Sequence, residues 1–169
     1  MNFLAKTAML ISLIYYVVLI GIAWIGQILG LHNEIWDLYD FPVQPGSPPL
    51  WTLLVGLLVS AGALACLGMA YAAIWRILKG GRGQDFRDLA RRLKRVGIGL
   101  IGFWLGYNLL SGAVQHLIVI GLEDIRDFDF GWDPLDLDIV FFILGIAMMA
   151  ISQTLERAWL AEEENQQFL

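Results

Sequence analysis

Residues 50–74 read LWTLLVGLLVSAGALACLGMAYAAI and contain no charged side chain. An uncharged apolar helix of about 20 residues is long enough to cross the roughly 30 Å of hydrocarbon in a lipid bilayer. Three further stretches of similar length and character lie at about 7–31, 96–122 and 135–155. The sequence therefore predicts an all-α, integral membrane four-helix bundle, with residues 1–169 forming a single four-span membrane domain.

The composition of the whole chain agrees with a membrane protein. Of its 169 residues, 58% are hydrophobic and 16% are charged, against roughly 45–50% and about 25% in soluble domains. Hydrophobicity this high excludes a soluble globular domain and a disordered chain, and the single cysteine, Cys66, excludes a disulfide scaffold. The net charge of -5 argues against direct nucleic-acid binding.

The basic residues predict how the four spans are oriented. Eight of the 11 Lys and Arg residues lie in the connection between the second and third spans. They are Arg76, Lys79, Arg82, Arg87, Arg91, Arg92, Lys94 and Arg95. Because connections rich in Lys and Arg stay in the cytoplasm, four spans place both termini there as well. We therefore expect a multi-pass protein of the inner (cytoplasmic) membrane, with N and C termini cytoplasmic.

A short amphipathic helix is expected before the third span. Asp85 can cap it, and apolar side chains recur at helical spacing from Phe86 to Leu93 while the opposite face is basic. We expect this helix to lie on the membrane surface and to run into the third span. The glutamates at 162–164 start from the same surface, so we expect the tail to continue the fourth helix and to turn them toward this basic helix.

Aromatic and small residues predict where the helices meet the membrane surface and each other. Trp75 and Trp159 fall near the inner boundary, whereas Trp24 and Trp104 lie deeper and are expected to pack against neighbouring helices. Small residues four positions apart let helix backbones approach closely in lipid. The pairs are Gly26 and Gly30, Gly102 and Gly106, and Ala61 and Ala65. We favour packing within the bundle over contacts with another subunit.

Polar side chains within the spans are candidates for ligand binding. Asn108, Ser111 and Gln115 share one face of the third span; interhelical hydrogen bonding is the favoured interpretation, and a polar pathway or ligand pocket is the alternative. His32 and His116 lie toward the outer ends of the first and third spans and are weak candidates for holding a haem or pigment. No haem motif surrounds either one, so we favour interfacial histidines.

No pattern in the sequence predicts catalysis. There is no nucleophile–base arrangement, no phosphate-binding glycine loop after a strand and no metalloprotease motif. The carboxylates of residues 127–133 do not follow the spacing of a calcium-binding EF-hand, so we favour a solvated acidic loop. We expect no catalytic residues, no cofactor and no metal.

Two segments resemble one known family. The first is residues 79–97, with the turn KGGRGQDF, then Leu89 and LKRVG; the second is the tail LAEEENQQF at 160–168. Together they resemble the bacterial four-span membrane proteins catalogued as domain of unknown function 2975, which share a G…F turn before the third span and an EEN tail after the fourth. In layout the resemblance covers nearly the whole chain.

This resemblance implies a bacterial protein with no established enzyme activity or cofactor. Some family members are encoded beside small helix-turn-helix regulators, which implies, by analogy, a membrane partner for a cytoplasmic regulator. We therefore expect a non-catalytic accessory or regulatory protein with a cytoplasmic interaction face. The residues expected to bind the partner are Phe86, Arg91, Arg92, Glu163, Glu164 and Asn165. The basic ones are also expected to hold anionic lipid headgroups. The alternatives are a structural subunit of a larger membrane protein complex and, less favoured, a haem- or pigment-binding bundle.

Overall fold

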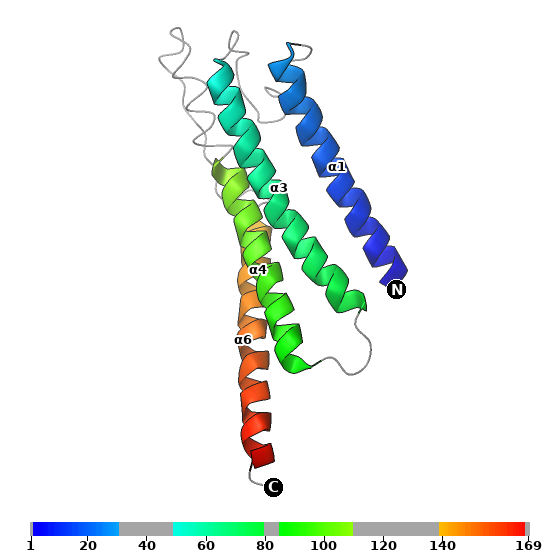
Figure 1. Cartoon of the computed structure of the whole chain (residues 1–169), viewed down its shortest axis with the longest axis vertical. Helices are drawn as coiled ribbons and strands as arrows, with labels where there is room; N and C mark the ends of the chain where they lie inside the picture. Colours follow the sequence, from blue (N-terminus) through cyan, green and yellow to red (C-terminus); the bar gives the residue numbers. More distant parts are fainter. Residues whose placement is uncertain (1, 31–48, 80–84, 110–138, 168–169) are drawn as a thin grey trace.

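The computed structural model describes residues 2–30, 49–79, 85–109 and 139–167, which form four helices (Figure 1). They are α1 (Asn2–Ile28), α3 (Leu50–Lys79), α4 (Phe86–Leu109) and α6 (Ile139–Gln167). A helical bundle is therefore confirmed for the described part of the chain. Within that part, α1, α3 and α6 are long and apolar enough to cross a membrane.

The helices differ from the predicted spans mainly at their ends. α1 begins at Asn2 and ends at Ile28, α3 continues to Lys79, and α6 runs to Gln167 instead of ending near 155. The prediction that the tail continues the fourth helix is thus confirmed. The part of the third span beyond Leu109 and the start of the fourth before Ile139 lie outside the described residues.

α4 starts where the sequence places its cap. The backbone N–H of Arg87 donates to Asp85 Oδ1 at 3.1 Å, and the carbonyl of Asp85 accepts the N–H groups of Asp88 and Leu89 at 3.1 and 3.0 Å. This is the bonding expected of an N-cap aspartate. From there α4 continues without a break to Leu109, so the amphipathic helix runs into the start of the third span as one element, whereas its position on the membrane surface stays a prediction.

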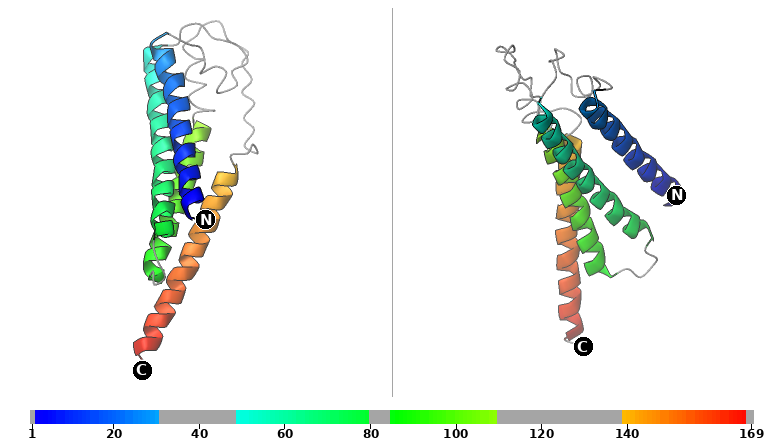
Figure 2. Two further views of the ribbon diagram at one scale, coloured as in Figure 1. Left: turned by 90° about the vertical axis from the view of Figure 1, so that its right-hand side faces the viewer. Right: turned by 45° about the horizontal axis from the view of Figure 1, so that its top comes forward.

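The four helices pack in the order in which they occur in the chain. Close backbone contacts join α1 to α3, α3 to α4 and α4 to α6, and among the described helices none joins α1 to α6. Figure 2 shows α6 inclined to the other helices and extending beyond them at its C-terminal end. The bundle is therefore open, and α1 is held mainly by α3.

Aromatic side chains add contacts between helices, including α1 and α4, whose backbones do not approach each other. The ring of Phe103, on α4, lies edge-on to Tyr16 of α1 at 6.1 Å and to Phe141 of α6 at 5.2 Å between centroids. Such edge-to-face pairs are favourable beyond the area that they bury. Trp104 lies 4.7 Å from the ring of Phe142 on α6, so its predicted packing against a neighbouring helix is confirmed.

Small residues bring α3 and α4 together. A Cβ added to Gly99 would lie 2.6 Å from the carbonyl oxygen of Cys66, and one added to Gly102 would lie 2.8 Å from its Sγ. A Cβ on Gly106 would lie 2.6 Å from Cβ of Ala63. The predicted Gly102 and Gly106 pair therefore lies in a helix contact, and Gly99 extends the same surface.

Two other predicted small pairs are corrected by the structure. Ala61 and Ala65 are both exposed, because the face of α3 that meets α4 is rotated away from them. Gly26 is buried, but Gly30 has a φ of 68° and its N–H bonds to the carbonyl of Gln27 at 3.1 Å. Gly30 therefore ends α1 as a left-handed C-terminal glycine and does not pack against a helix.

α4 and α6 meet at a pair of glycines that the sequence analysis missed. A Cβ on Gly97 would lie 2.6 Å from both the carbonyl oxygen of Gly145 and Cγ of Met149. Toward the C-terminal end of α6, the buried hydroxyl of Ser152 donates to the carbonyl of Ala90 at 2.7 Å. Gly97 and Gly145 lie on different helices, and neither has another small residue four positions away on its own helix. The spacing of small residues therefore does not predict this contact.

α1 rests on α3 through one large side chain. Trp24 is 1% exposed, and its six-membered ring fills the space that a Cβ on Gly56 would occupy. Nearer the other end of the contact, the hydroxyl groups of Ser12 and Tyr71 are hydrogen-bonded at 3.1 Å. The predicted packing of Trp24 against a neighbouring helix is thus confirmed, and its partner is a glycine.

Candidate functional site

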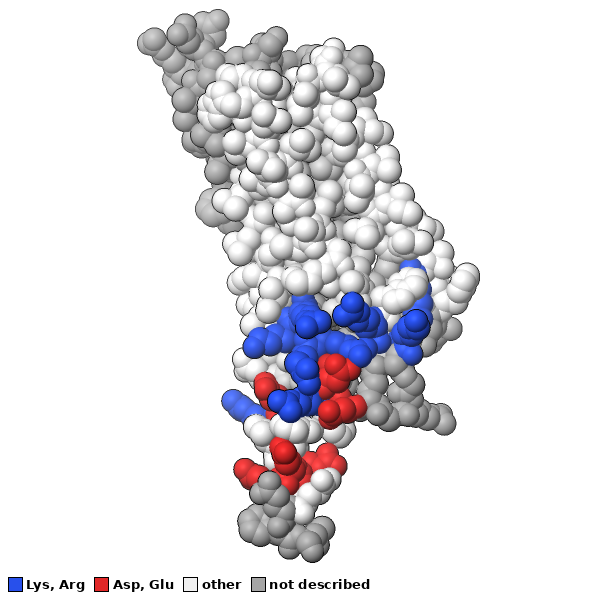
Figure 3. All heavy atoms as spheres, viewed as in Figure 1, with Lys and Arg blue, Asp and Glu red and all other residues white. Residues whose placement is uncertain are grey.

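The described charged residues gather at one end of the bundle, while the rest of the visible described surface is uncharged (Figure 3). We call the Lys and Arg residues of this end the basic belt: Lys6, Arg76, Lys79, Arg87, Arg91, Arg92, Lys94, Arg95 and Arg157. The belt combines the start of α1, the end of α3, the start of α4 and the C-terminal half of α6. Segments far apart in the sequence therefore form a single charged end.

Arg92 holds the ends of two helices together. Its Nη2 pairs with Asp88 Oδ2 at 2.5 Å, one helical turn away on α4, and its Nη1 donates to the carbonyl of Arg76 at 2.7 Å. That carbonyl lies in the last turn of α3, where carbonyls lack helical partners. Arg92, predicted to bind a partner, therefore has a structural task within the chain.

Two cation–aromatic contacts strengthen the same end. Lys6 Nζ lies 5.2 Å from the centre of the Trp75 ring, joining α1 to α3. The guanidinium of Arg87 lies 4.7 Å from the Trp159 ring, joining α4 to α6. At exposed sites such contacts contribute about 0.5–1 kcal/mol each. The sequence predicted both tryptophans near the inner boundary, but it did not predict the cations that cover them.

The tail glutamates do not turn toward α4. Glu162, Glu163 and Glu164 are exposed, and within the described segments no ion pair joins them to α4. Trp159 of α6 contacts Arg87 in the first turn of α4, and the glutamates follow Trp159 along α6. The glutamates lie beyond the start of α4, so no residue of α4 lies opposite them. The prediction that they turn toward α4 is therefore wrong.

The predicted partner-binding residues therefore form two groups. Phe86, 47% exposed, and the exposed Arg91 lie with Arg92 at the start of α4. Glu163, Glu164 and Asn165 lie exposed on the projecting end of α6. The two groups share one end of the molecule, and the contact between Arg87 and Trp159 joins the two helices that carry them.

The candidates for ligand binding fall largely beyond what the structure describes. His32, His116, Ser111, Gln115 and the acidic segment 127–133 lie outside the described residues. Asn108 is described, and its Nδ2 donates to the carbonyl of Trp104 in its own helix at 2.9 Å. Across the described segments, no three His, Cys, Asp or Glu side chains gather where a metal could bind.

An open apolar groove of about 390 Å³ runs along α1. Its lining residues are Ile11, Ile14, Tyr15, Val18, Leu19 and Ile22. Ile11 is 62% exposed and Tyr15 60% exposed, so this face of α1 lies on the outside of the described bundle. An apolar surface of this kind suits acyl chains or another membrane helix and offers nothing for acid–base chemistry.

Comparisons with protein-family models, with curated proteins and with solved structures find no match to this chain. The resemblance to domain of unknown function 2975 therefore stays a prediction.

Proposed function

We propose that the chain is a non-catalytic multi-pass protein of the bacterial inner membrane, acting as an accessory or regulatory protein with a cytoplasmic interaction face. Three described helices long enough to cross a bilayer support membrane insertion. The collection of basic side chains at one end supports a cytoplasmic position for that end, because Lys and Arg are retained on the cytoplasmic side. α1 starts and α6 ends there (Figure 1), so both termini are cytoplasmic in this proposal.

The proposed interaction face is inferred from the end of α6 that projects beyond α4. The helix continues past the contact of Trp159 with Arg87 and exposes Glu162, Glu163, Glu164 and Asn165. Successive residues of a helix point in different directions, so these side chains cover most of its circumference. Exposed polar residues that support no packing serve binding more often than stability. A cytoplasmic protein with a complementary basic surface is the partner that this chemistry favours.

Replacing Glu162, Glu163 and Glu164 together with glutamine tests the interaction face. We expect partner capture from gently solubilised membranes to fall at least about tenfold, because three charges of one sign are lost from the contact. The melting temperature should not change, since the glutamates form no described ion pair. Quantitative mass spectrometry of the captured proteins and a melting curve measure the two effects.

Glu156→Gln is the matched control, because Glu156 is an exposed acid of α6 that precedes Trp159. This variant should keep the partner at the wild-type level. A large loss of stability in the triple variant, with the partner retained, would make the tail a structural strut. Unchanged results in both measurements would refute the proposed face.

Single cysteines in a Cys66→Ala background test the proposed orientation. A membrane-impermeant maleimide should label Phe128→Cys in intact cells, because four spans put that position outside. Asn165→Cys should be labelled only after the membrane is opened. Labelling of position 165 in intact cells would overturn the cytoplasmic position of the tail and, with it, the proposed function.

A structural subunit of a larger membrane complex is the second candidate function. The observation that favours it is the outer face of α1, whose apolar groove is left uncovered by the other described helices. Co-purification of an integral membrane protein that is lost on Val18→Trp but kept on Glu162/Glu163/Glu164→Gln would favour this alternative. The haem or pigment alternative concerns His32 and His116 and stays a prediction.

A further inference from the structure

The exposed face of α4 changes abruptly from basic to apolar. Arg91, Lys94 and Arg95 are exposed, and beyond them along the helix Ile98 and Leu105 are 46% and 49% exposed. Positions 91, 95, 98 and 105 recur at helical spacing and so form one row along the helix. Three residues of helix, about 4.5 Å, separate Arg95 from Ile98. Charged and apolar surfaces thus adjoin within one turn.

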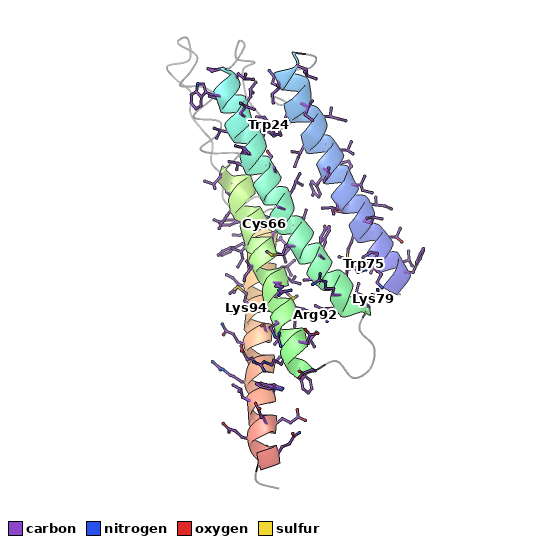
Figure 4. The ribbon with its side chains drawn as sticks, viewed as in Figure 1. Trp24, Cys66, Trp75, Lys79, Arg92 and Lys94 are labelled. Carbon is purple, nitrogen blue, oxygen red and sulfur yellow. The ribbon has the colours of Figure 1, made fainter. Side chains whose placement is uncertain are left out.

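The cations at the head of this row lack counter-charges. Arg91, Lys94 and Arg95 form no ion pair with any described residue. The nearest acid on the helix, Asp88, pairs with Arg92. Figure 4 shows Lys94 and Arg92 on opposite sides of α4, so the Asp88–Arg92 pair does not neutralise this face.

The other described acids at this end, Glu156 of α6 included, form no ion pair with these three cations. Asp85 accepts the N–H of Arg87 as the helix cap, and the sequence of residues 80–84, GGRGQ, adds a cation and no acid. The tail glutamates lie beyond the start of α4. Three like charges within two helical turns repel each other, so this surface favours an anion from outside the chain.

We propose that this face of α4 is a binding site for an anionic phospholipid. The phosphate lies among Arg91, Lys94 and Arg95, and the acyl chains lie along Ile98 and Leu105. Arginine binds phosphate oxygens in a forked geometry, and the surplus positive charge selects a headgroup with net negative charge over a zwitterionic one. This inference rests on the membrane location proposed above and assigns Arg91 to lipid, leaving the tail for a protein partner.

Binding of phosphatidylglycerol to the purified full-length chain in neutral detergent micelles tests the site. Phosphatidylcholine is the reference lipid, and a fluorophore on the acyl chain reports binding. A basic residue near the surface changes the affinity for anionic lipid about fivefold. We expect the preference for phosphatidylglycerol to fall about fivefold in Arg95→Gln and on the order of 100-fold when Arg91, Lys94 and Arg95 are all glutamine. The preference should also weaken as salt is added.

Arg157→Gln is the matched control, since Arg157 is an exposed cation of the same end but lies on α6, outside the row on α4. Less than a twofold change is expected there. An equal loss in Arg157→Gln and Arg95→Gln would overturn the site, because the belt would then act only through its total charge. Competition by soluble glycerol phosphate as effective as that by phosphatidylglycerol would assign the cations to free phosphate and reject the lipid.

Two further measurements keep the test decisive. Circular dichroism and elution volume show whether the triple variant folds; if it does not, Arg95→Gln and Lys94→Gln carry the test. The maleimide experiment on position 165 separates the two proposals. Cytoplasmic labelling with an unchanged lipid preference in the α4 variants would reject only the lipid site, whereas labelling from outside would reject the proposed orientation itself.

Discussion

Trp24→Ala is expected to destabilise the protein by about 3–5 kcal/mol, as for other large buried aromatic side chains. Trp24 is 1% exposed and lies against Gly56. The loss should be large because α1 has close backbone contacts with α3 alone among the described helices. Unfolding followed by circular dichroism in one detergent measures the change. Trp51→Ala is the matched control: Trp51 is 54% exposed, and its loss should cost less than about 1 kcal/mol.

The contact with Gly56 gives this prediction a second test. Gly56→Ala alone should destabilise the protein, because the new Cβ would overlap the Trp24 ring. In the Trp24→Ala background the same substitution should cost nothing, since the ring is gone. The coupling free energy of this double-mutant cycle should exceed about 1 kcal/mol. Additive effects would mean that the two residues do not meet.

Gly99→Ala is expected to destabilise the protein by about 1–3 kcal/mol, the usual range for overpacking. The added Cβ would lie 2.6 Å from the carbonyl oxygen of Cys66 and 2.9 Å from the backbone nitrogen of Ala70. These are backbone atoms of α3, so the new methyl group cannot be accommodated by a side-chain rotation. α3 and α4 would have to separate along their shared surface.

Gly68→Ala is the matched control for Gly99→Ala. A Cβ at Gly68 meets nothing within 4 Å, and alanine forms helix more readily than glycine by about 1 kcal/mol. Gly68→Ala should therefore leave stability unchanged or raise it. Equal destabilisation by both substitutions would show that the close approach of α3 and α4 is absent in the protein. Parallel melting curves in the same detergent decide this.

Part of the charged end was predictable because it depends on neighbours in the chain. Asp85 caps α4 through the N–H of Arg87, two residues away, and Arg92 reaches Asp88 one turn earlier. Residues this close in sequence are brought together by the helix itself. By contrast, the contact of Lys6 with Trp75 joins the N-terminal end of α1 to the C-terminal end of α3. No local pattern predicts it, because the contact depends on how α1 and α3 are aligned.

Helix packing, like the charged end, was predictable from the sequence only in part. Gly102 and Gly106 share a helix face by their spacing, and the structure places that face against α3. Ala61 and Ala65 have the same spacing but are exposed. Gly97 and Gly145 meet across two helices without such a pair on either. Spacing tells which residues share a face, whereas the rotation of each helix about its axis selects the face that packs.

Residue type alone predicts the helical class, the three long apolar helices and the charge asymmetry. The reason is that the length of an apolar run and the position of Lys and Arg are properties of consecutive residues. The tertiary structure decided which surfaces are used within the chain and which remain free. α4 begins opposite Trp159, so Glu162, Glu163 and Glu164 project beyond its first turn. Arg92 turns inward to Arg76 while Lys94 turns outward. These outcomes depend on the relative length, offset and rotation of packed helices, which no single segment encodes.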